Sequence, residues 1–155
     1  MKDIRKALSL ILALVMALSL SVGAMAADYP AETKTLDDIA ADLTGKTVIL
    51  HSNDVHGQVD GYAYIAGLKT ELKARGAEVI LADAGDFSQG TPYVSISKGA
   101  TAIEMMNAAG YNVATLGNHE FDYGDEQLMK NLGNAEFKAI CADVLKNGKA
   151  RLDAT

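Results

Sequence analysis

The sequence predicts a domain of the α/β class, built from parallel strand–helix–strand units. Three short apolar runs are each followed by a loop with a glycine beside a carboxylate, as expected where a buried strand ends in a turn. The interval from Asp54 to Asp86 is 32 residues, and the interval from Asp86 to Asn118 is again 32. That interval is about the length of one βαβ unit. The carboxyl ends of the strands should therefore present these loops at one edge of a sheet.

The first 26 residues have the three parts of a secretory signal peptide. Lys2, Arg5 and Lys6 form a basic start, residues 8–20 are apolar, and small residues at 24 and 26 frame a cleavage site. This apolar run is shorter than the roughly 20 residues that span a bilayer. We expect cleavage after residue 26 and export to the periplasm, the cell surface or the exterior, with an uncleaved anchor as the alternative.

The chain has 155 residues, 49% of them hydrophobic, which is enough for one domain with a core. Its formal charge of −6 would become −8 without residues 1–26, because three basic residues and one acidic residue are removed. An acidic chain without clustered Lys and Arg is a poor candidate for nucleic-acid binding. An anionic substrate would need metal cations in the site to invert the local field.

We expect residues 27–45 to be a linker followed by a short helix, and 46–155 to be the main domain. Thr35 can cap this helix, Asp37 and Asp38 would lie in its first turn, and Gly45 would end it. This segment carries no residues that suggest chemistry.

In the main domain, strands and helices should alternate. Thr47–His51 is continuously apolar up to its histidine, which favours a strand buried on both faces. Gly61–Arg75 has aliphatic residues at spacings of three and four, which predicts an amphipathic crossover helix. The later expected elements are a strand at 79–81, a loop at 87–99, a helix at 101–109, a strand at 111–116, a helix at 125–132 and a strand at 137–142.

Polar residues gather at the end of each expected strand. A carboxylate and an imidazole two residues apart, such as Asp54 and His56, can converge on one ion when the chain curls, although a simple polar turn is the alternative. His51 lies within the strand and is better explained as a hydrogen-bonded core histidine or one that supports a ligand. We expect Asp83 to close a turn and Cys141 to be a small buried side chain.

The sequences of these three loops resemble those of the bacterial 5′-nucleotidase family of the calcineurin-like metallophosphoesterases. The matching segments are ILHSNDVHG, DAGDFSQGTP and LGNHEFDYG. The resemblance covers roughly residues 48–144. It implies part of a calcineurin-like metallophosphoesterase sandwich, with metal ligands at the carboxyl ends of the strands. It also implies an exported enzyme that releases phosphate from 5′-nucleotides.

The resemblance assigns a role to six residues. Asp54 and His56 would hold a first ion, Asp86 would bridge two ions, and Asn118 would bind the second. His119 would face the phosphate as an imidazolium, oriented by Asp122. The cofactors would be two divalent metal ions about 3.5–4 Å apart that share an attacking hydroxide. Nitrogen and oxygen ligands without thiolates fit Zn²⁺, Mn²⁺ or Co²⁺.

The same resemblance shows a shortage of ligands. The family adds two further histidines from a later part of the metal domain, whereas the histidines of this chain are His51, His56 and His119. We therefore expect an N-terminal portion of a longer enzyme, inactive by itself, whose partner would be the missing C-terminal half. Half a sandwich should also be marginally stable and prone to associate. The alternatives are hydrolysis of 2′,3′-cyclic nucleotides or nucleotide sugars, or a non-catalytic metal-binding remnant.

Overall fold

The computed structural model describes residues 35–152, so the expected signal peptide and cleavage site lie outside the described residues. The chain divides into two compact units, Met1–Ile39 and Ala40–Thr155, and each is described by itself. Within residues 35–152, no helix is long and apolar enough to cross a membrane.

In the first unit, the described part contains a single turn of 3-10 helix, η1 (Leu36–Asp38). Thr35 caps it as expected, and its backbone N–H and hydroxyl both donate to Asp38 Oδ2, at 2.7 and 2.9 Å. The predicted extension of this helix to Gly45 is wrong. Ile39 already has an extended backbone, with φ −98° and ψ 133°, which ends the helical hydrogen bonding after one turn.

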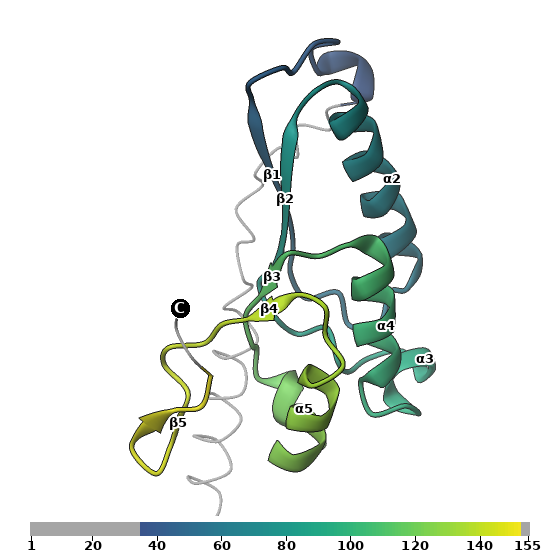
Figure 1. Cartoon of the computed structure of the whole chain (residues 1–155). Coiled ribbons are helices and arrows are strands. Elements are labelled where there is room, and N and C mark those ends of the chain that lie inside the picture. The colour runs from purple at the N-terminus through teal and green to yellow at the C-terminus, as the bar shows by residue number, and fades with distance from the viewer. Residues whose placement is uncertain (1–34, 153–155) are drawn as a thin grey trace, which may run out of the picture. The chain divides into compact units, whose positions relative to one another are not determined.

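The second unit is organised around a four-stranded sheet, which confirms the predicted α/β class with parallel strands (Figure 1). Strand order along the sheet follows the chain order, and every neighbouring pair is parallel. The long pair runs from Thr47 opposite Glu78 to Ser52 opposite Asp83. The strands are β1 (Thr47–Ser52), β2 (Glu78–Asp83), β3 (Val113–Ala114) and β4 (Lys138–Ala139).

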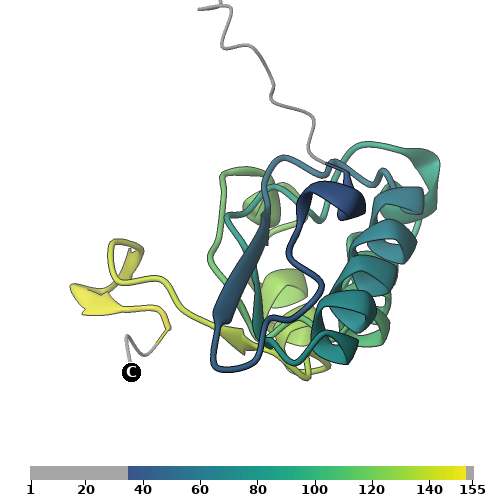
Figure 2. The ribbon, with the colours of Figure 1, turned by 90° about the horizontal axis from the view of Figure 1, so that it is seen from above.

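Helices α2 (Asp60–Ala74) and α4 (Ala100–Ala109) pack side by side on one face of this sheet (Figure 2). Their bounds lie within one residue of those predicted at each end, and α5 (Asp125–Leu132) has the predicted bounds. The core lies between α4 and β2, where Leu81 and Met106 are completely buried and Ile103 is 1% exposed. Cys141 is buried, as expected.

The expectation that β1 is buried on both faces is wrong. Its side chains alternate between exposed and half-buried, and Ile49 is 65% exposed. His51 is also exposed, so it is not a core histidine. The reason is that β1 is an edge strand and that the helices of the described part cover one face of it. An apolar strand sequence shows that a strand can be buried, but whether it is buried depends on which elements cover it.

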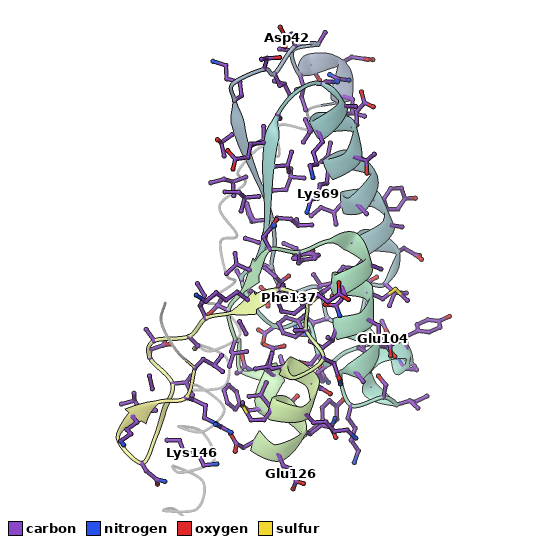
Figure 3. All side chains as sticks on the ribbon, viewed as in Figure 1. Asp42, Lys69, Glu104, Glu126, Phe137 and Lys146 are labelled. Atoms are coloured by element: carbon purple, nitrogen blue, oxygen red, sulfur yellow. The ribbon has the colours of Figure 1, made fainter. Side chains whose placement is uncertain are left out.

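The strands expected at 111–116 and 137–142 are shorter than predicted, because β3 and β4 have two residues each. The structure also contains two features that the sequence analysis did not predict. Within the expected loop 87–99, Pro92 at the first position begins a one-turn helix, α3 (Pro92–Ser95). Beyond β4, a hairpin joins β5 (Leu145–Lys146) to β6 (Lys149–Ala150). Its turn residues Asn147 and Gly148 have φ values of 54° and 75°, the conformation that Asn-Gly favours in two-residue hairpins. Figure 3 shows Lys146 on this hairpin and Phe137 among the interior side chains.

Candidate metal centre

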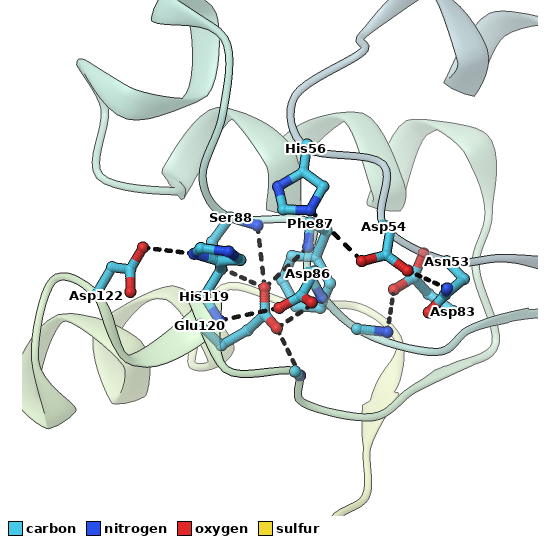
Figure 4. A network of polar contacts seen from close by, with 12 residues as sticks. Asn53, Asp54, His56, Asp83, Asp86, Phe87, Ser88, His119, Glu120 and Asp122 are labelled. Atoms are coloured by element: carbon cyan, nitrogen blue, oxygen red, sulfur yellow. Dashed lines mark hydrogen bonds and ion pairs between the residues drawn. The ribbon is translucent and has the colours of Figure 1, made fainter. Parts of the chain in front are cut away.

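The loops after β1, β2 and β3 bring the predicted site residues to one edge of the sheet (Figure 4). Asp54 and His56 follow β1, and Asp86 follows β2. The six candidates are completed by the loop after β3, which carries Asn118 and His119 and then Asp122. His119 begins a turn of 3-10 helix, η2 (His119–Phe121), and Asn118 precedes it as the cap residue.

The backbone at these positions is unusual. Asp54, His56 and Asp86 have φ values of 52°, 47° and 62°, a left-handed conformation that side chains with a Cβ rarely adopt. Hydrogen bonds between the loops hold it, because Asp54 N donates to Gly85 O at 3.1 Å and His56 N donates to Asp86 O at 3.0 Å. Such conformations cost about 1–3 kcal/mol each and persist where the surroundings determine them.

Two glycines allow the loops to approach each other. A Cβ on Gly85, whose φ is +103°, would lie 2.4 Å from the backbone nitrogen of Gly117. A Cβ on Gly117 would lie 2.2 Å from Asp86 Oδ1. This close approach places the Asp86 carboxylate against the loop after β3.

Three of the predicted ligands form one donor cluster. Asp54, His56 and Asp86 each offer a ligand atom, and these atoms lie within 4.8 Å of one another. His56 Nε2 is 3.5 Å from Asp54 Oδ1, and both side chains are partly open to solvent. Two carboxylates and an imidazole that converge in this way fit a divalent cation of the Zn²⁺, Mn²⁺ or Co²⁺ type.

His119 and Asp122 form the predicted carboxylate–imidazole pair. His119 Nδ1 lies 2.7 Å from Asp122 Oδ2. This hydrogen bond raises the pKa of His119, so the pair favours the imidazolium form. The backbone N–H of His119 donates to Asp86 Oδ1 at 2.9 Å, and its ring stands edge-on to that of His56 with centroids 4.9 Å apart. The histidine is thus held next to the donor cluster.

Asp83 closes a turn, as predicted, because its Oδ1 accepts a hydrogen bond from Gly85 N at 2.8 Å. Its other oxygen accepts a hydrogen bond of 2.5 Å from the hydroxyl of Ser52, which in turn lies 2.6 Å from Tyr111 Oη. The side chain is 4% exposed, and burial raises the pKa of Asp83 to about 6. The carboxylate therefore anchors the ends of β1 and β2 beneath the donor cluster.

Glu120 is the residue of this site that sequence reasoning missed. In the sequence it is one more polar member of the heptad LGNHEFD, whereas in the structure it is 2% exposed and bonded to the loops after both β2 and β3. The position of Glu120 close to an apolar strand end was a partial signal, because a Glu that faces inward there needs buried hydrogen-bond partners. The sequence alone does not decide whether the side chain faces inward or outward.

Comparison with known proteins assigns this fold to a family. The family model of the calcineurin-like phosphoesterases matches residues 47–148. The chain belongs to the calcineurin-like phosphoesterase family. The resemblance inferred from the three motifs is confirmed at this level. A solved calcineurin-like phosphoesterase, YfkN from Bacillus subtilis, superposes with a TM-score of 0.59 and 28% identity, over 67% of this chain and 39% of that one.

Curated relatives of this calcineurin-like phosphoesterase chain are 5′-nucleotidases. That of Vibrio vulnificus is 31% identical over 142 residues, which are 84% of this chain and 26% of the relative. That of Diplobatis ommata is 41% identical over 112 residues, which are 62% of this chain and 19% of the relative. The chain thus spans about a fifth to a quarter of the length of these relatives.

Proposed function

We propose that this chain carries the first part of the active site of an exported, metal-dependent phosphohydrolase that releases phosphate from 5′-nucleotides. The observation that carries the proposal is the donor cluster of Asp54, His56 and Asp86 beside the His119–Asp122 pair. The likeness to curated 5′-nucleotidases supports the substrate class.

The metal sites would be held by residues from three loops. Asp54 and His56 would hold one divalent ion, Asp86 would contribute to both ions, and Asn118 would contribute to the second. Bound divalent ions supply a water of lowered pKa and neutralise charge on the phosphoryl oxygens. The hydrogen bond from His119 N to Asp86 Oδ1 fixes the orientation of the Asp86 carboxylate.

His119 would act on the substrate as a general acid. Its Nδ1 is engaged by Asp122 Oδ2 at 2.7 Å, which leaves Nε2 for the substrate. A proton held at Nε2 can stabilise negative charge on a phosphoryl oxygen or pass to the leaving oxygen of the nucleoside. Asp122 holds the ring in the orientation and the charge state that this requires.

The chain by itself should hydrolyse nucleotides poorly. Within residues 35–152, the clustered His, Asp and Glu donors number three, and two Mn²⁺ or Zn²⁺ ions need more ligands than these and Asn118 supply. The same observation favours a second candidate function, a non-catalytic protein that binds a single metal ion.

A hybrid enzyme tests the proposal. Residues 47–148 would replace the matching segment of the Vibrio vulnificus 5′-nucleotidase, and release of phosphate from 5′-AMP would be measured with Mn²⁺ or Zn²⁺. We expect metal-dependent hydrolysis, with kcat reduced at least ~100-fold by His119→Ala. Tyr64→Ala is the control, because that side chain is 81% exposed on α2 and lies outside the candidate site, and it should leave kcat unchanged.

The hybrid also separates the two candidates. If it folds, as judged by circular dichroism, and binds Mn²⁺ but hydrolyses no phosphoester, then the non-catalytic candidate is favoured and the hydrolase proposal fails. If it hydrolyses 2′,3′-cyclic AMP or a nucleotide sugar but not 5′-AMP, then the substrate class is corrected while the chemistry stands.

Export by residues 1–26 is also part of the proposal. The basic start, apolar run and small residues at 24 and 26 support it. Expression of the full chain in a bacterial host, followed by intact mass measurement of the periplasmic and membrane fractions, tests it. A mature protein that begins at residue 27 is expected, and retention of an unprocessed chain in the cytoplasm would contradict export.

A further inference from the structure

Glu120 occupies the interior of the site, although it does not belong to the donor cluster. Its side chain is 2% exposed. Oε2 accepts hydrogen bonds from Asp86 N at 2.8 Å and Gly117 N at 2.7 Å. Oε1 accepts three more, from Phe87 N at 2.9 Å, Ser88 N at 3.0 Å and the Ser88 hydroxyl at 2.7 Å. Figure 4 shows this carboxylate between the two loops.

These five bonds use the accepting capacity of both carboxylate oxygens. Glu120 is therefore engaged by the protein and is not available to a metal ion. Among residues 35–152 the structure records no salt bridge for Glu120, and its charge is stabilised by N–H and O–H dipoles. A buried carboxylate satisfied in this way fixes the donors that surround it, because moving any of them exposes a charge to an apolar interior.

One of the donors that Glu120 fixes is the backbone N–H of Asp86, the predicted bridging ligand. Asp86 has φ +62°, and its N–H points at Glu120 while its Oδ1 accepts the N–H of His119. The loop after β2 thus donates to Glu120, and the loop after β3 donates to Asp86. We call these two opposed bonds the reciprocal clamp. It ties the conformation of Asp86 to the position of His119.

We propose that Glu120 is a positioning residue that holds Asp86 in its left-handed conformation and thereby sets the metal affinity of the Asp54–His56–Asp86 cluster. The inference rests on the proposed metal site. It assigns to Glu120 no contact with metal or substrate. Its effect is exerted through the reciprocal clamp, which keeps the Asp86 carboxylate aimed at the donors from the loop after β1.

Co²⁺ binding to the purified chain tests the proposal, through the affinity and the visible absorption spectrum of the bound ion. Two variants separate the effect of the negative charge at position 120 from the effect of side-chain length. Glu120→Gln keeps the length of the side chain but turns an amide N–H₂ toward N–H donors, and Glu120→Asp keeps the charge but is too short to bond both loops. We expect each variant to weaken Co²⁺ binding by about 10- to 100-fold and to change the spectrum of the remaining bound ion.

The matched control is Asn131→Ala. Asn131 is likewise buried, at 6% exposed, and its side chain donates to Lys98 O at 2.7 Å in the turn between α3 and α4. This variant should lower the thermal midpoint while its Co²⁺ affinity and spectrum match those of the parent. Equal Co²⁺ affinity and spectrum in the parent and in both Glu120 variants would overturn the positioning role, as would an equal loss in Asn131→Ala.

A milder variant covers the case in which the Glu120 variants do not fold. Ser88→Ala removes one of the five bonds and should weaken Co²⁺ binding about two- to fivefold, by loosening the clamp. Amide hydrogen exchange in metal-free protein gives a second readout. In Glu120→Gln, the amides of Asp86 and Gly117 should exchange at least ~10-fold faster, while that of Leu81 is unchanged.

The two proposals fail differently. If the parent binds Co²⁺ no better than Asp54→Asn, the metal site itself is wrong, although faster exchange at Asp86 in Glu120→Gln would still show the clamp. If Asp54→Asn abolishes binding while the Glu120 variants bind and exchange like the parent, the metal site stands and the inference about Glu120 is wrong.

Discussion

The carboxyl ends of the strands and the outer face of β1 are built in opposite ways. At the strand ends, three loops meet with left-handed residues, glycines in close contact and a buried carboxylate that accepts five hydrogen bonds. On β1, Ile49 is 65% exposed and the nearby His51 is exposed as well. One region is determined in detail by its own contacts, and the other is a face of the sheet that the described residues leave exposed.

The difference shows that the order of the site does not depend on covering both faces of the sheet. The loops are fixed by bonds among themselves, such as Asp54 N to Gly85 O at 3.1 Å, and by the packing of β2 under α4. Changes at the strand ends should therefore alter folding and metal binding together. Changes on the β1 face should alter how the chain associates.

The largest effect should come from Gly85→Ala. The new Cβ would lie 2.4 Å from Gly117 N, at a φ of +103° that alanine rarely adopts. We expect the free energy of unfolding to fall by about 3 kcal/mol and metal binding to be lost, because Asp86 is the next residue. Urea unfolding and titration with Mn²⁺ measure the two effects.

Gly61→Ala is the control for that substitution. Gly61 lies in α2, where an added Cβ would find open space within 4 Å, and alanine is the better helix former there. This variant should change the free energy of unfolding by less than about 1 kcal/mol, in the stabilising direction. Similar losses in both variants would mean that the loop contact at Gly85 is not special.

The next effect concerns the pH dependence of stability. Burial raises the pKa of Asp83 to about 6, above the value of about 3.9 in an unfolded chain. The folded state therefore holds a proton more tightly than the unfolded state. The contribution of Asp83 to the stability of the fold is therefore largest below about pH 4, and it is lost as pH rises through about 6.

Asp83→Asn should remove this dependence. In metal-free protein, we expect the free energy of unfolding of the parent to fall by about 2 kcal/mol between pH 4 and pH 7 from this group, and that fall to be absent in the variant. Urea unfolding at a series of pH values measures it. An equal pH dependence in parent and variant would show that another group is responsible.

Sequence reasoning reached the parts of the site that depend on local pattern. The spacing of Asp54, Asp86 and Asn118 reflects one βαβ unit each, so the meeting of their loops at one edge follows from the topology of a parallel sheet. The turn at Asp83 also follows from local chemistry.

Two of the errors concern properties that depend on distant residues. The burial of Glu120 is decided by N–H groups about 32 positions earlier in the chain, and the exposure of Ile49 by what covers the sheet. The hairpin at Asn147 and Gly148 is different, because an Asn-Gly turn is a local signal that the sequence itself displays.

A smaller effect is expected where this hairpin meets α5. Arg151 and Lys146 bond Asp125 at 2.7 and 2.5 Å, and they lower the pKa of Asp125 to about 2. The contribution of ionised Asp125 to stability is present above about pH 4 and is lost as pH falls through about 2. Asp125→Asn should speed trypsin cleavage after Lys146 without changing metal affinity. Unchanged cleavage would mean that these exposed ion pairs do not hold the hairpin.

The smallest effect on folding, and the sharpest test of the contrast, is expected at Ile49. Because its side chain is 65% exposed, Ile49→Lys should change the free energy of unfolding by no more than about 0.5 kcal/mol and leave Mn²⁺ affinity unchanged.

An apolar edge strand is nevertheless a surface on which copies of a chain associate. Sedimentation velocity over a range of concentrations should show less self-association in Ile49→Lys than in the parent. Ile96→Lys is the matched control, since Ile96 is 85% exposed next to α3 and away from the sheet. If both variants reduce association equally, general surface hydrophobicity is the cause, and the face of β1 has no special part in it.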